Sequence, residues 1–502
     1  MAPEPLRPVL VTGGAGYIGS HVVFVLLQTR KYKVISIDNY HNSYPEALKR
    51  VSELAKDELP ADASEQDRES AEVDSFSGDL TQAADVRAIF EKYGKGGIWG
   101  VIHIAAYKAV GESSEIPLTY YANNVGATIQ LCQIMSEFDC TRFVYSSSAT
   151  VYGIPPIIPI PESTPLKADS VYGRTKVMSE TVLQDLCHAE PDTWRVISLR
   201  YFNPAGAHPS GRIGEDPRGR PGNLLPLLSQ MAVGRVKDAE LKVFGNDYPT
   251  HDGTCVRDYL HVMDLASGHL LALEALASTS HPAFANLPDR AKYKGYNLGR
   301  GAGQSVLDIV NAMRKATGKD YKTRVIGRRL GDVPDLTADP ALAEKELGFH
   351  ASQDLETMCK DLWNWQSKNP EGYSTPEAQH VDITTHDWVK VPSAASISPE
   401  ANEKSELPKS SEDSEQPQPE VTSDAMNSTF VMHCPTIPTL AALHDPCTPA
   451  YLSPHSAGTP TESSQAPKTP VADIQTAVVE GEGVKELTPS DVFIDKKVVE
   501  AL

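Results

Sequence analysis

A short glycine pattern near the N-terminus constrains the fold more than any other feature of this sequence. The run VLVTGGAGYIGSHVV places Gly13, Gly16 and Gly19 directly after an apolar segment and at the start of a helix-forming one. Glycines at this spacing let the backbone turn sharply from a strand into a helix and approach a pyrophosphate at the positive helix end. A tight turn without a ligand is the alternative, but the flanking strand and helix favour a dinucleotide site.

The first 379 residues alternate short apolar segments with longer segments of helical period. Strands are predicted at PVLVTGG, KVISIDNY, GVIHIAA, RFVYSSS and RVISLRYFN, a short strand at SFSGDL, and helices at IGSHVVFVLLQ, NNVGATIQLCQIM and KVMSETVLQDLC. Nearly continuous apolar strands that alternate with helices predict an α/β fold with a Rossmann-type doubly wound parallel sheet, covered by helices on both faces.

Changes in composition divide the chain into three predicted parts. Residues 1–202 form a nucleotide-binding domain with a polar surface insertion at 56–74, and residues 203–379 form a smaller second α/β domain. Residues 380–502 hold 19 acidic and 7 basic residues and only four Phe, Trp or Tyr. Such a segment buries too little apolar area to offset its ordering entropy, so we expect an acidic, Ser/Pro-rich disordered tail. Its Ser-Pro and Thr-Pro pairs are candidate phosphosites, and a short helix is an option at 491–502.

Charge and cysteine usage narrow the classes of function. The formal net charge of −20, with no basic stripe, argues against a nucleic-acid partner. Seven cysteines without a CxxC pair indicate a reducing compartment, so we expect a cytoplasmic protein. No signal peptide is recognisable, and no apolar run approaches the roughly 20 residues that cross a membrane. The scattered His/Cys pairs lack zinc-site spacing, so no metal is predicted.

An acidic residue follows the second predicted strand. Asp38 stands where a carboxylate accepts hydrogen bonds from a ribose, and its charge repels a 2′-phosphate. No Arg or Lys lies in residues 38–42 to offset that repulsion, so NAD is favoured over NADP as the cofactor. Asp79, which closes the SFSGDL segment, is a candidate adenine contact, with a plain turn as the alternative.

The tripeptide VYG occurs twice, and only the second copy has a lysine four residues after its tyrosine. Tyr172 and Lys176 therefore share one helix face. A nearby ammonium and a positive nicotinamide ring favour the phenolate, so we expect the pKa of Tyr172 to fall below its usual ~10 and Tyr172 to act as a base. In the first copy, Pro156 stands where the lysine of Tyr152 would be, so no acid–base role is assigned to Tyr152.

The position of the second VYG copy in the chain helps to decide whether its tyrosine and lysine form a catalytic pair or only a solvent-exposed helix face. It follows a dinucleotide motif and a predicted strand that ends in Ser146, Ser147 and Ser148. Ligands of parallel sheets bind beyond the carboxyl ends of the strands. This setting favours a catalytic reading of Ser148, Tyr172 and Lys176.

Longer stretches carry a resemblance to a known family. TGGAGYIGSHVV, SSSATVYG, VYGRTK, YFNPAGAHPSGRIGEDPRG, FGNDYPTHDGTCVRDYLHVMDLA and YNLGRGAGQSVLD resemble the UDP-glucose 4-epimerase (UDP-galactose 4-epimerase) family of extended short-chain dehydrogenases/reductases. The resemblance spans roughly residues 8–372 and leaves the tail outside. It implies an isomerase of galactose metabolism that holds NAD tightly, oxidises the 4-hydroxyl of UDP-galactose to a 4-ketose and reduces it again on the other face.

The resemblance also implies that residues 203–379 are the substrate domain, which binds the UDP-sugar, and it implies roles for individual residues. Tyr172 would be the base, Lys176 its partner and a contact of the nicotinamide ribose, and Ser148 a proton relay. The implied NAD contacts are Gly13, Gly16, Tyr17, Ile18, Gly19, Asp38, Asn39, Asp79, Leu80, Ala105, Ala106, Lys108, Asn123, Ser148, Tyr172, Lys176 and Phe202. The implied substrate contacts are Ser148, Tyr172, Asn203, Asn223, Leu224, Phe244, Arg257, Arg329, Asp332 and Leu336. Without the resemblance, Lys108 reads as a solvated lysine and Arg257 as half of a local ion pair.

Several alternatives stay open at this point. Leu336 stands where some family members carry a bulky tyrosine, so UDP-GlcNAc and UDP-GalNAc are further candidate substrates. Related nucleotide-sugar enzymes are alternatives, namely a UDP-glucuronate 4-epimerase or a 4,6-dehydratase. A dehydratase requires an acid pair directly after the serine, whereas Ala149 and Thr150 follow Ser148 here. A non-catalytic NAD-binding scaffold is the rival from another class. The family resemblance also implies a homodimer formed through a helix bundle, and the tail suggests a regulatory partner.

Overall fold

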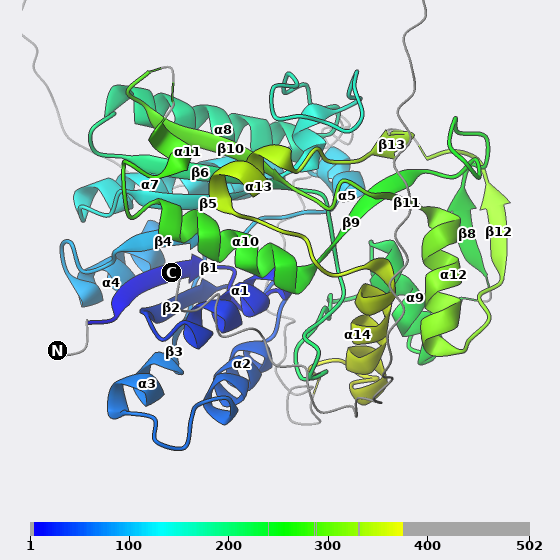
Figure 1. The fold of residues 1–502 in the computed structure, drawn as a ribbon, viewed down its shortest axis with the longest axis horizontal. Helices are drawn as coiled ribbons and strands as arrows, with labels where there is room; N and C mark the ends of the chain where they lie inside the picture. Colours follow the sequence, from blue (N-terminus) through cyan, green and yellow to red (C-terminus); the bar gives the residue numbers. More distant parts are fainter. Residues whose placement is uncertain (1–4, 239, 286, 288, 330–331, 375–502) are drawn as a thin grey trace, which may run out of the picture. The chain divides into compact units, whose positions relative to one another are not determined.

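The protein is described by a computed structural model over residues 5–374, except 239, 286, 288, 330 and 331 (Figure 1). These residues belong to one unit, which spans Met1–Pro392. The tail predicted at 380–502, its candidate phosphosites and the helix option at 491–502 lie outside the described residues.

Within the described residues, seven strands form a parallel sheet in the order β10-β6-β5-β4-β1-β2-β3 (Figure 1). The order reverses between β1 and β4, which makes the carboxyl ends of these two strands a switch point where such sheets bind ligands. The predicted doubly wound sheet is therefore confirmed. Its strands are β1 (Arg7–Thr12), β2 (Tyr32–Asp38), β3 (Val73–Ser77), β4 (Gly100–His103), β5 (Arg142–Ser148), β6 (Arg195–Tyr201) and β10 (Lys292–Leu298).

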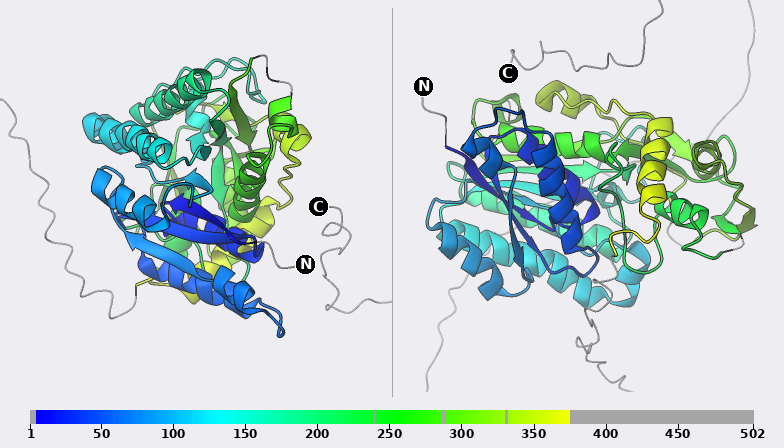
Figure 2. Two further views of the ribbon diagram at one scale, coloured as in Figure 1. Left: turned by 90° about the vertical axis from the view of Figure 1, so that its left-hand side faces the viewer. Right: turned by 90° about the horizontal axis from the view of Figure 1, so that it is seen from below.

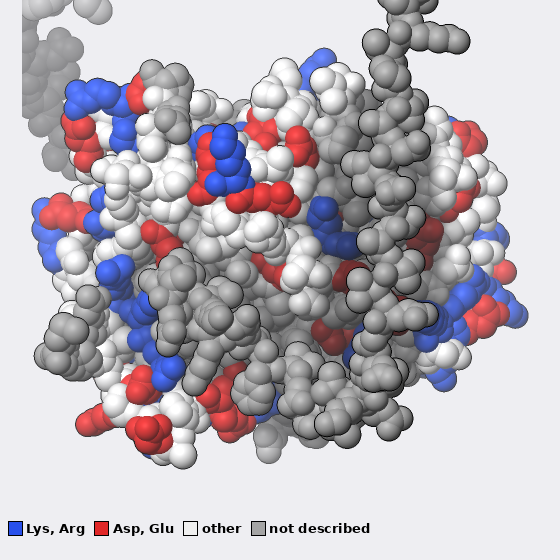
Figure 3. All heavy atoms as spheres, in the orientation of Figure 1, with Lys and Arg blue, Asp and Glu red and all other residues white. Residues whose placement is uncertain are grey.

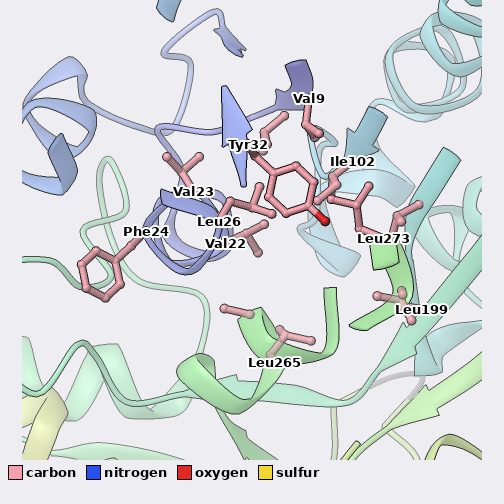
Figure 4. Close-up of a cluster of buried hydrophobic side chains, with 14 of the residues drawn as sticks. Val9, Val22, Val23, Phe24, Leu26, Tyr32, Ile102, Leu199, Leu265 and Leu273 are labelled. Atoms are coloured by element: carbon pink, nitrogen blue, oxygen red, sulfur yellow. The ribbon is translucent and has the colours of Figure 1, made fainter. Parts of the chain in front are cut away.

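Helices cover both faces of this sheet (Figures 1 and 2). Successive strand residues point to opposite faces, so Val9 and Val11 pack in one hydrophobic cluster and Leu10 in another. Figure 4 shows the first cluster, in which Val22 of α1 and Leu265 of α10 accompany Val9. The first face carries α1 (Tyr17–Gln28), α2 (Pro45–Asp57) and α10 (Val262–Ala275), and the second carries α4 (Ala83–Tyr93), α7 (Ala127–Glu137) and α8 (Val171–Ala189).

Two smaller sheets and three helices, all from segments that follow β6, pack together in a second part of the molecule. Its core contains Leu228, Met313 and Trp365, all buried. The strands are β7 (Asn203–Ala205), β9 (Val256–His261), β11 (Gly303–Ser305) and β13 (Asp335–Leu336) in one sheet, and β8 (Leu241–Phe244) and β12 (Thr323–Ile326) in another. The helices are α9 (Leu224–Ala232), α12 (Val306–Thr317) and α14 (Leu355–Lys368).

Short helices connect these elements. In the stretch predicted as an insertion, Ser64 and Asp67 cap each other in a capping box that begins a helix before β3. The short helices are α3 (Glu65–Ser70), α5 (Val110–Glu115), α6 (Pro117–Tyr121), the π-helix η1 (Ala122–Gly126), the 3-10 helix η2 (Ala149–Tyr152), α11 (Pro282–Ala285) and α13 (Ala341–Leu347).

The chain returns to the first sheet after it has entered the second part. Strand β10 and helix α10 come from the segment predicted as the substrate domain, but β10 pairs with β6 and α10 packs in the cluster of α1. The boundary between residues 202 and 203 stays a prediction, and the sheet itself draws strands from both sides of it.

Two further observations concern the charge on the surface and the character of the helices. On the face shown in Figure 3, basic and acidic side chains both occur, and many lie next to one another where side chains are described. None of the helices in the described part of the chain combines the length and apolar character that a bilayer crossing requires.

Candidate active site

The glycine pattern forms the predicted turn from β1 into α1. Gly13 has a φ of +70°, and a Cβ on it would lie 2.9 Å from the backbone of Ala105. A Cβ on Gly19 would lie 2.0 Å from the carbonyl oxygen of Gly13. The N-terminus of α1 has no side-chain cap and no acidic residue in its first turn. The turn is thus a cradle of backbone at a positive helix end, which fits the pyrophosphate of NAD.

Asp38, the last residue of β2, is fixed by three hydrogen bonds. Its Oδ2 accepts from the backbone of Ala15 at 3.0 Å, and its Oδ1 accepts from the backbone of Tyr40 and from Ser43 Oγ, both at 2.8 Å. Burial raises the pKa of Asp38, and these hydrogen bonds oppose the rise. A carboxylate held beside the glycine turn fits the ribose-binding role that the sequence predicts.

A second pair of predicted contacts lies beside Asp38. Asn39 Nδ2 donates to Asp79 Oδ2 at 3.1 Å, and Asp79 Oδ1 accepts from the backbone of Thr81 at 2.8 Å. Strands β2 and β3 are neighbours, so residues 38–39 and 79–80 meet at adjacent strand ends. This arrangement fits a polar edge for an adenine.

Lys108 reaches a residue that sequence reasoning did not single out. Its Nζ donates to Glu215 Oε1 at 3.2 Å, and Glu215 is buried whereas Lys108 is half exposed. Glu215 belongs to the segment between β7 and α9, from which Gly206 also accepts a hydrogen bond from Tyr17 at 2.8 Å. The segment after β7 therefore contacts the glycine turn and the predicted pyrophosphate lysine.

Ser148, Tyr172 and Lys176 converge beyond the carboxyl end of β5. Ser148 ends that strand, and Tyr172 and Lys176 occupy the first two turns of α8. All three side chains are buried. Lys176 Nζ donates to the carbonyl oxygen of Ser146 at 2.7 Å and lies 5.9 Å from the centroid of the Tyr172 ring. The structure thus brings the three predicted catalytic residues together.

The electrostatics of Tyr172 differ from the sequence prediction. Burial raises the pKa of Tyr172 to about 12, and a hydrogen bond with Ser148 opposes that rise. Burial also lowers the pKa of Lys176 to about 7, and the nearby negative charge of Glu180 partly opposes this fall. For the groups that this chain supplies, the pKa of Tyr172 lies above its usual value rather than below it, because desolvation outweighs the hydrogen bond with Ser148. The fall predicted for Tyr172 beside a nicotinamide ring stays a prediction.

A buried ion pair lies one turn beyond Lys176 on α8. Glu180 and Arg200 of β6 pair at 2.7 Å. The carboxylate also accepts from Ser147 Oγ at 2.5 Å and from the hydroxyl of Tyr293 at 2.9 Å. Because buried charges are tolerated only when paired and hydrogen-bonded, this saturated carboxylate fixes α8 against β5 and β6.

Tyr152 of the first VYG copy belongs to the same network. Its hydroxyl donates to Asn297 Oδ1 at 2.7 Å and accepts from Arg200 Nη1 at 3.0 Å. Burial raises the pKa of Tyr152 to about 12. These contacts give Tyr152 a structural role, in keeping with the absence of a lysine partner.

A second buried polar chain joins the ends of β1 and β4 to α8. Thr12 Oγ1 lies 2.7 Å from His103 Nδ1, and His103 Nε2 lies 3.0 Å from Thr128 Oγ1. Thr128 donates to the carbonyl oxygen of Asn124 at 2.7 Å, and Asn124 Nδ2 donates to Thr175 Oγ1 at 3.1 Å. Burial lowers the pKa of His103 to about 3, so this imidazole is neutral. The chain of contacts fixes the glycine-turn strand relative to the catalytic helix.

Two predicted substrate arginines share one carboxylate. Arg257 Nη2 lies 3.4 Å and Arg329 Nη2 lies 3.1 Å from Asp332 Oδ1. The guanidinium carbon of Arg329 lies 5.1 Å from the centroid of the Phe244 ring. Two planar cations beside an aromatic face fit a diphosphate and a flat base.

Leu336 connects the arginine group to the catalytic strand. It pairs with Arg257 across β13 and β9. It also packs against a buried cluster that contains Ala149 and Phe202. Since Ala149 follows Ser148 directly, Leu336 lies between the predicted diphosphate and catalytic groups.

The remaining predicted contacts occupy neighbouring elements. Leu224 packs into the core beneath α9 with Leu228 and Trp365. For the following residues, the structure gives the position, and the binding role stays a prediction. The residues are Tyr17 and Ile18 at the start of α1, Leu80 after β3, Ala105 and Ala106 after β4, Asn123 in η1, Asn203 in β7, and Asn223 and Leu224 at the start of α9.

Sequence reasoning missed Glu180, Arg200, Glu215 and also Arg218, whose guanidinium donates to the carbonyl oxygen of Tyr40 after β2 at 3.2 Å. Glu180 stands four residues beyond Lys176, a spacing that does place the two on one helix face. Glu215 and Arg218 lie inside GEDPRG, within a stretch that carries the family resemblance, but their partners lie far away in sequence. Local patterns do not reveal such partners.

One group of possible metal ligands occurs in the described part of the chain. Ligand atoms of His251, Asp252 and Asp308 lie within 4.8 Å of one another. Both carboxylates already have local partners, since Asp252 accepts from Thr254 and Asp308 caps α12 with Ser305. The sequence expectation that no metal takes part stays a prediction.

Comparison with known proteins gives a consistent result. Residues 9–287 match the model of the NAD dependent epimerase/dehydratase family. The chain is 47% identical to the UDP-glucose 4-epimerase of Drosophila melanogaster over 381 residues, which cover 74% of this chain and 99% of that relative. It is 49% identical to the UDP-glucose 4-epimerase of Bacillus subtilis (strain 168) over 370 residues, which cover 74% and 99% respectively.

Solved structures show the same similarity. The crystal structure of UDP-glucose 4-epimerase from Bifidobacterium longum, in complex with NAD+ and UDP, superimposes with a TM-score of 0.64 at 41% identity. The match covers 73% of this chain and all of that one. Sequence and structural similarity therefore extend over nearly the whole length of these relatives.

Proposed function

We propose a function from the premise that this chain belongs to the NAD dependent epimerase/dehydratase family and, within it, to the UDP-glucose 4-epimerases. It is an NAD-dependent isomerase that interconverts UDP-galactose and UDP-glucose at C4 through a 4-keto intermediate, a reaction of galactose metabolism. The match covers almost the full length of these relatives, which supports the same activity for this chain.

One observation carries this proposal within the structure. A buried serine, tyrosine and lysine converge at the carboxyl end of β5, and a glycine turn with a fixed carboxylate lies at the switch point of the same sheet. This arrangement suits the oxidation of an alcohol carbon beside a dinucleotide.

In this proposal the chain's own groups move one proton. The Tyr172 oxygen takes the proton of the sugar 4-hydroxyl and later returns it to the same oxygen of the sugar, and Ser148 bonds both groups. Lys176 favours the phenolate whenever it carries its charge, and the spacing on α8 keeps it beside Tyr172. When bound, NAD supplies a hydride acceptor and donor for C4 and a positively charged ring.

The substrate side extends the proposal to UDP. Arg257 and Arg329 bind the diphosphate, where their forked donors suit phosphate oxygens, and Phe244 lies against the base. Leu336 is smaller than an aromatic residue, so we further propose that the site accepts UDP-GlcNAc and UDP-GalNAc. Epimerisation of UDP-GlcNAc by the purified protein tests this extension, and no conversion at high enzyme concentration removes it.

We also propose that the protein is a homodimer in the cytoplasm. Apolar side chains are exposed on three neighbouring helices, Leu118 of α6 at 82%, Met178 of α8 at 47% and Ile129 of α7 at 38%, which supports a helix bundle between two copies. The five described cysteines are free and buried, which supports a reducing compartment. A monomer in sedimentation analysis would remove the dimer. A regulatory partner for the tail completes the proposal.

The function is tested with the purified protein and no added cofactor. NAD released by denaturation is quantified, and UDP-galactose conversion to UDP-glucose is followed. Bound NAD and turnover are the expected result. A protein that binds NAD but leaves UDP-galactose unchanged would instead support a scaffold or a related nucleotide-sugar enzyme.

A further inference from the structure

The loop that follows β2 is held from two sides. We call residues 38–44 the ribose loop and residues 206–222, between β7 and α9, the strap. From inside, Asp38 accepts hydrogen bonds from the backbone of Tyr40 and from Ser43 Oγ. Tyr40 has a φ of +55°, a conformation that non-glycine residues rarely adopt without support from their surroundings. The ribose loop therefore depends on contacts to keep its shape.

From outside, one residue of the strap spans the ribose loop. The backbone N–H of Arg218 donates to Asn42 Oδ1 at 2.8 Å. Its guanidinium donates to the carbonyl oxygens of Tyr40 at 3.2 Å and Ser43 at 3.0 Å, and lies 4.3 Å from the centroid of the Tyr44 ring. Arg218 thus contacts four residues of the loop, two of which also bond to Asp38.

The strap itself is firmly anchored a few residues before Arg218. Asp216 pairs with Arg235 at 2.6 Å and accepts from the backbone of Tyr373 at 2.8 Å. Trp365 Nε1 donates to the carbonyl oxygen of Glu215 at 3.2 Å. These anchors come from α14 and from the segments after α9 and α14. Arg218 therefore links a rigid part of the second half of the chain to the ribose loop, which begins with the carboxylate of Asp38.

We propose that Arg218 is a positioning residue for NAD, which holds the ribose loop around the cofactor and slows cofactor release. The inference rests on the proposed function, since it takes Asp38 as the ribose contact. Release of the adenosine half requires the ribose loop to loosen, and the guanidinium contacts resist that step. Turnover regenerates the cofactor within each cycle, so slow release keeps the protein active without free NAD.

The strap offers a matched control two residues away. Arg220 has the same side chain, lies in the same strap and pairs with Asp238 on the surface. Its hydrogen bonds go to Asp238 rather than to the ribose loop. Arg218→Gln and Arg220→Gln therefore remove the same charge from the same segment and differ in contact with residues 38–44.

The test measures retention of NAD. Wild type, Arg218→Gln and Arg220→Gln are loaded with NAD and desalted, and protein-bound NAD is quantified after increasing times. Because hydrogen bonds from a charged donor are lost, Arg218→Gln should release NAD roughly 10- to 100-fold faster than wild type. Arg220→Gln should release it at the wild-type rate. Turnover of Arg218→Gln should fall after desalting and recover when NAD is added back, which a merely misfolded variant would not do.

Each outcome has one reading. Equal release rates for Arg218→Gln and wild type overturn the proposal, and so does equally fast release from Arg220→Gln. If Arg218→Gln does not fold, Arg218→Lys serves as the test variant, since lysine keeps the positive charge but lacks the forked donors of the guanidinium. Faster release from Arg218→Lys supports the proposal, and wild-type release overturns it. A wild-type protein that never binds NAD would instead defeat the proposed cofactor site.

Discussion

The two VYG copies have the same tripeptide and opposite environments. Tyr152, in the first copy, is 1% exposed, and its hydroxyl is hydrogen-bonded to both Asn297 and Arg200. Tyr172, in the second copy, is 9% exposed and lies between Ser148 and Lys176 near the start of α8. Tyr152 therefore has a structural role within a polar network, whereas Tyr172 lies where it could exchange a proton with a substrate.

The cation near each tyrosine makes the difference. Arg200 beside Tyr152 is locked to Glu180 and stays charged at any ordinary pH. Burial brings the pKa of Lys176, beside Tyr172, to about 7, so its charge varies near neutral pH. The two environments therefore differ in whether the hydroxyl is already hydrogen-bonded within a buried ion-pair network, as in Tyr152, or lies beside Ser148 and a buried lysine, as in Tyr172. Four changes test this contrast.

The largest expected effect is that of Tyr172→Phe. The substitution removes the proton acceptor, so turnover of UDP-galactose should fall roughly 10²- to 10⁴-fold. Bound NAD, measured after denaturation, should stay at the wild-type level because the glycine turn and Asp38 are intact. Substantial turnover in this variant would assign the proton to another group.

Next in size is Glu180→Gln, which leaves Arg200 buried without its partner. Breaking a buried ion pair in this way should lower the free energy of unfolding by about 3–5 kcal/mol, measured by urea denaturation. Glu137→Gln, which breaks the exposed pair with Arg87, is the control and should leave the midpoint unchanged. Equal effects of the two variants would mean that the buried network does not hold α8.

The titration of Lys176 gives a pH-dependent prediction. Burial lowers the pKa of Lys176 from 10.5 to about 7, so the unfolded chain binds this proton more tightly than the folded one. Unfolding therefore takes up a proton in this window, and the free energy of unfolding should rise as pH rises from about 7 toward 10.5. Urea denaturation across the alkaline range should show this slope in wild type and a shallower one in Lys176→Met. Identical slopes would place a charged Lys176 in the folded protein.

The smallest expected effect belongs to Tyr152→Phe. Asn297 and Arg200 each lose a hydrogen-bond partner in the core, which should lower the free energy of unfolding by about 1–3 kcal/mol. Turnover, assayed below the unfolding transition, should stay close to wild type. A large loss of turnover at normal stability would give the first VYG copy a chemical role.

Local sequence patterns predicted much of this contrast. Strand-helix alternation predicted the sheet, and the glycine spacing and the Tyr172–Lys176 pair predicted a nucleotide turn and a catalytic group at the carboxyl ends of strands. The family resemblance added the arginines that meet at Asp332. The predicted sheet is confirmed because it rests on a pattern of neighbours in the chain, and the roles of the site residues stay predictions.

The rest depends on contacts between distant segments. Arg218 and Tyr40 are 178 residues apart, and Tyr152 and Asn297 are 145 apart. The pKa of Tyr172 depends on burial, which only the packed structure reveals, and burial raises it for the groups that this chain supplies. The return of β10 to the first sheet is likewise a matter of topology rather than of local pattern.

The most direct test compares the two tyrosine variants in one assay. Tyr152→Phe and Tyr172→Phe are purified in parallel, their bound NAD is quantified, and UDP-galactose conversion is followed without added cofactor. The structure predicts equal bound NAD in both, near-normal conversion in Tyr152→Phe and almost none in Tyr172→Phe. Equal conversion by the two variants would contradict the assignment of the catalytic base.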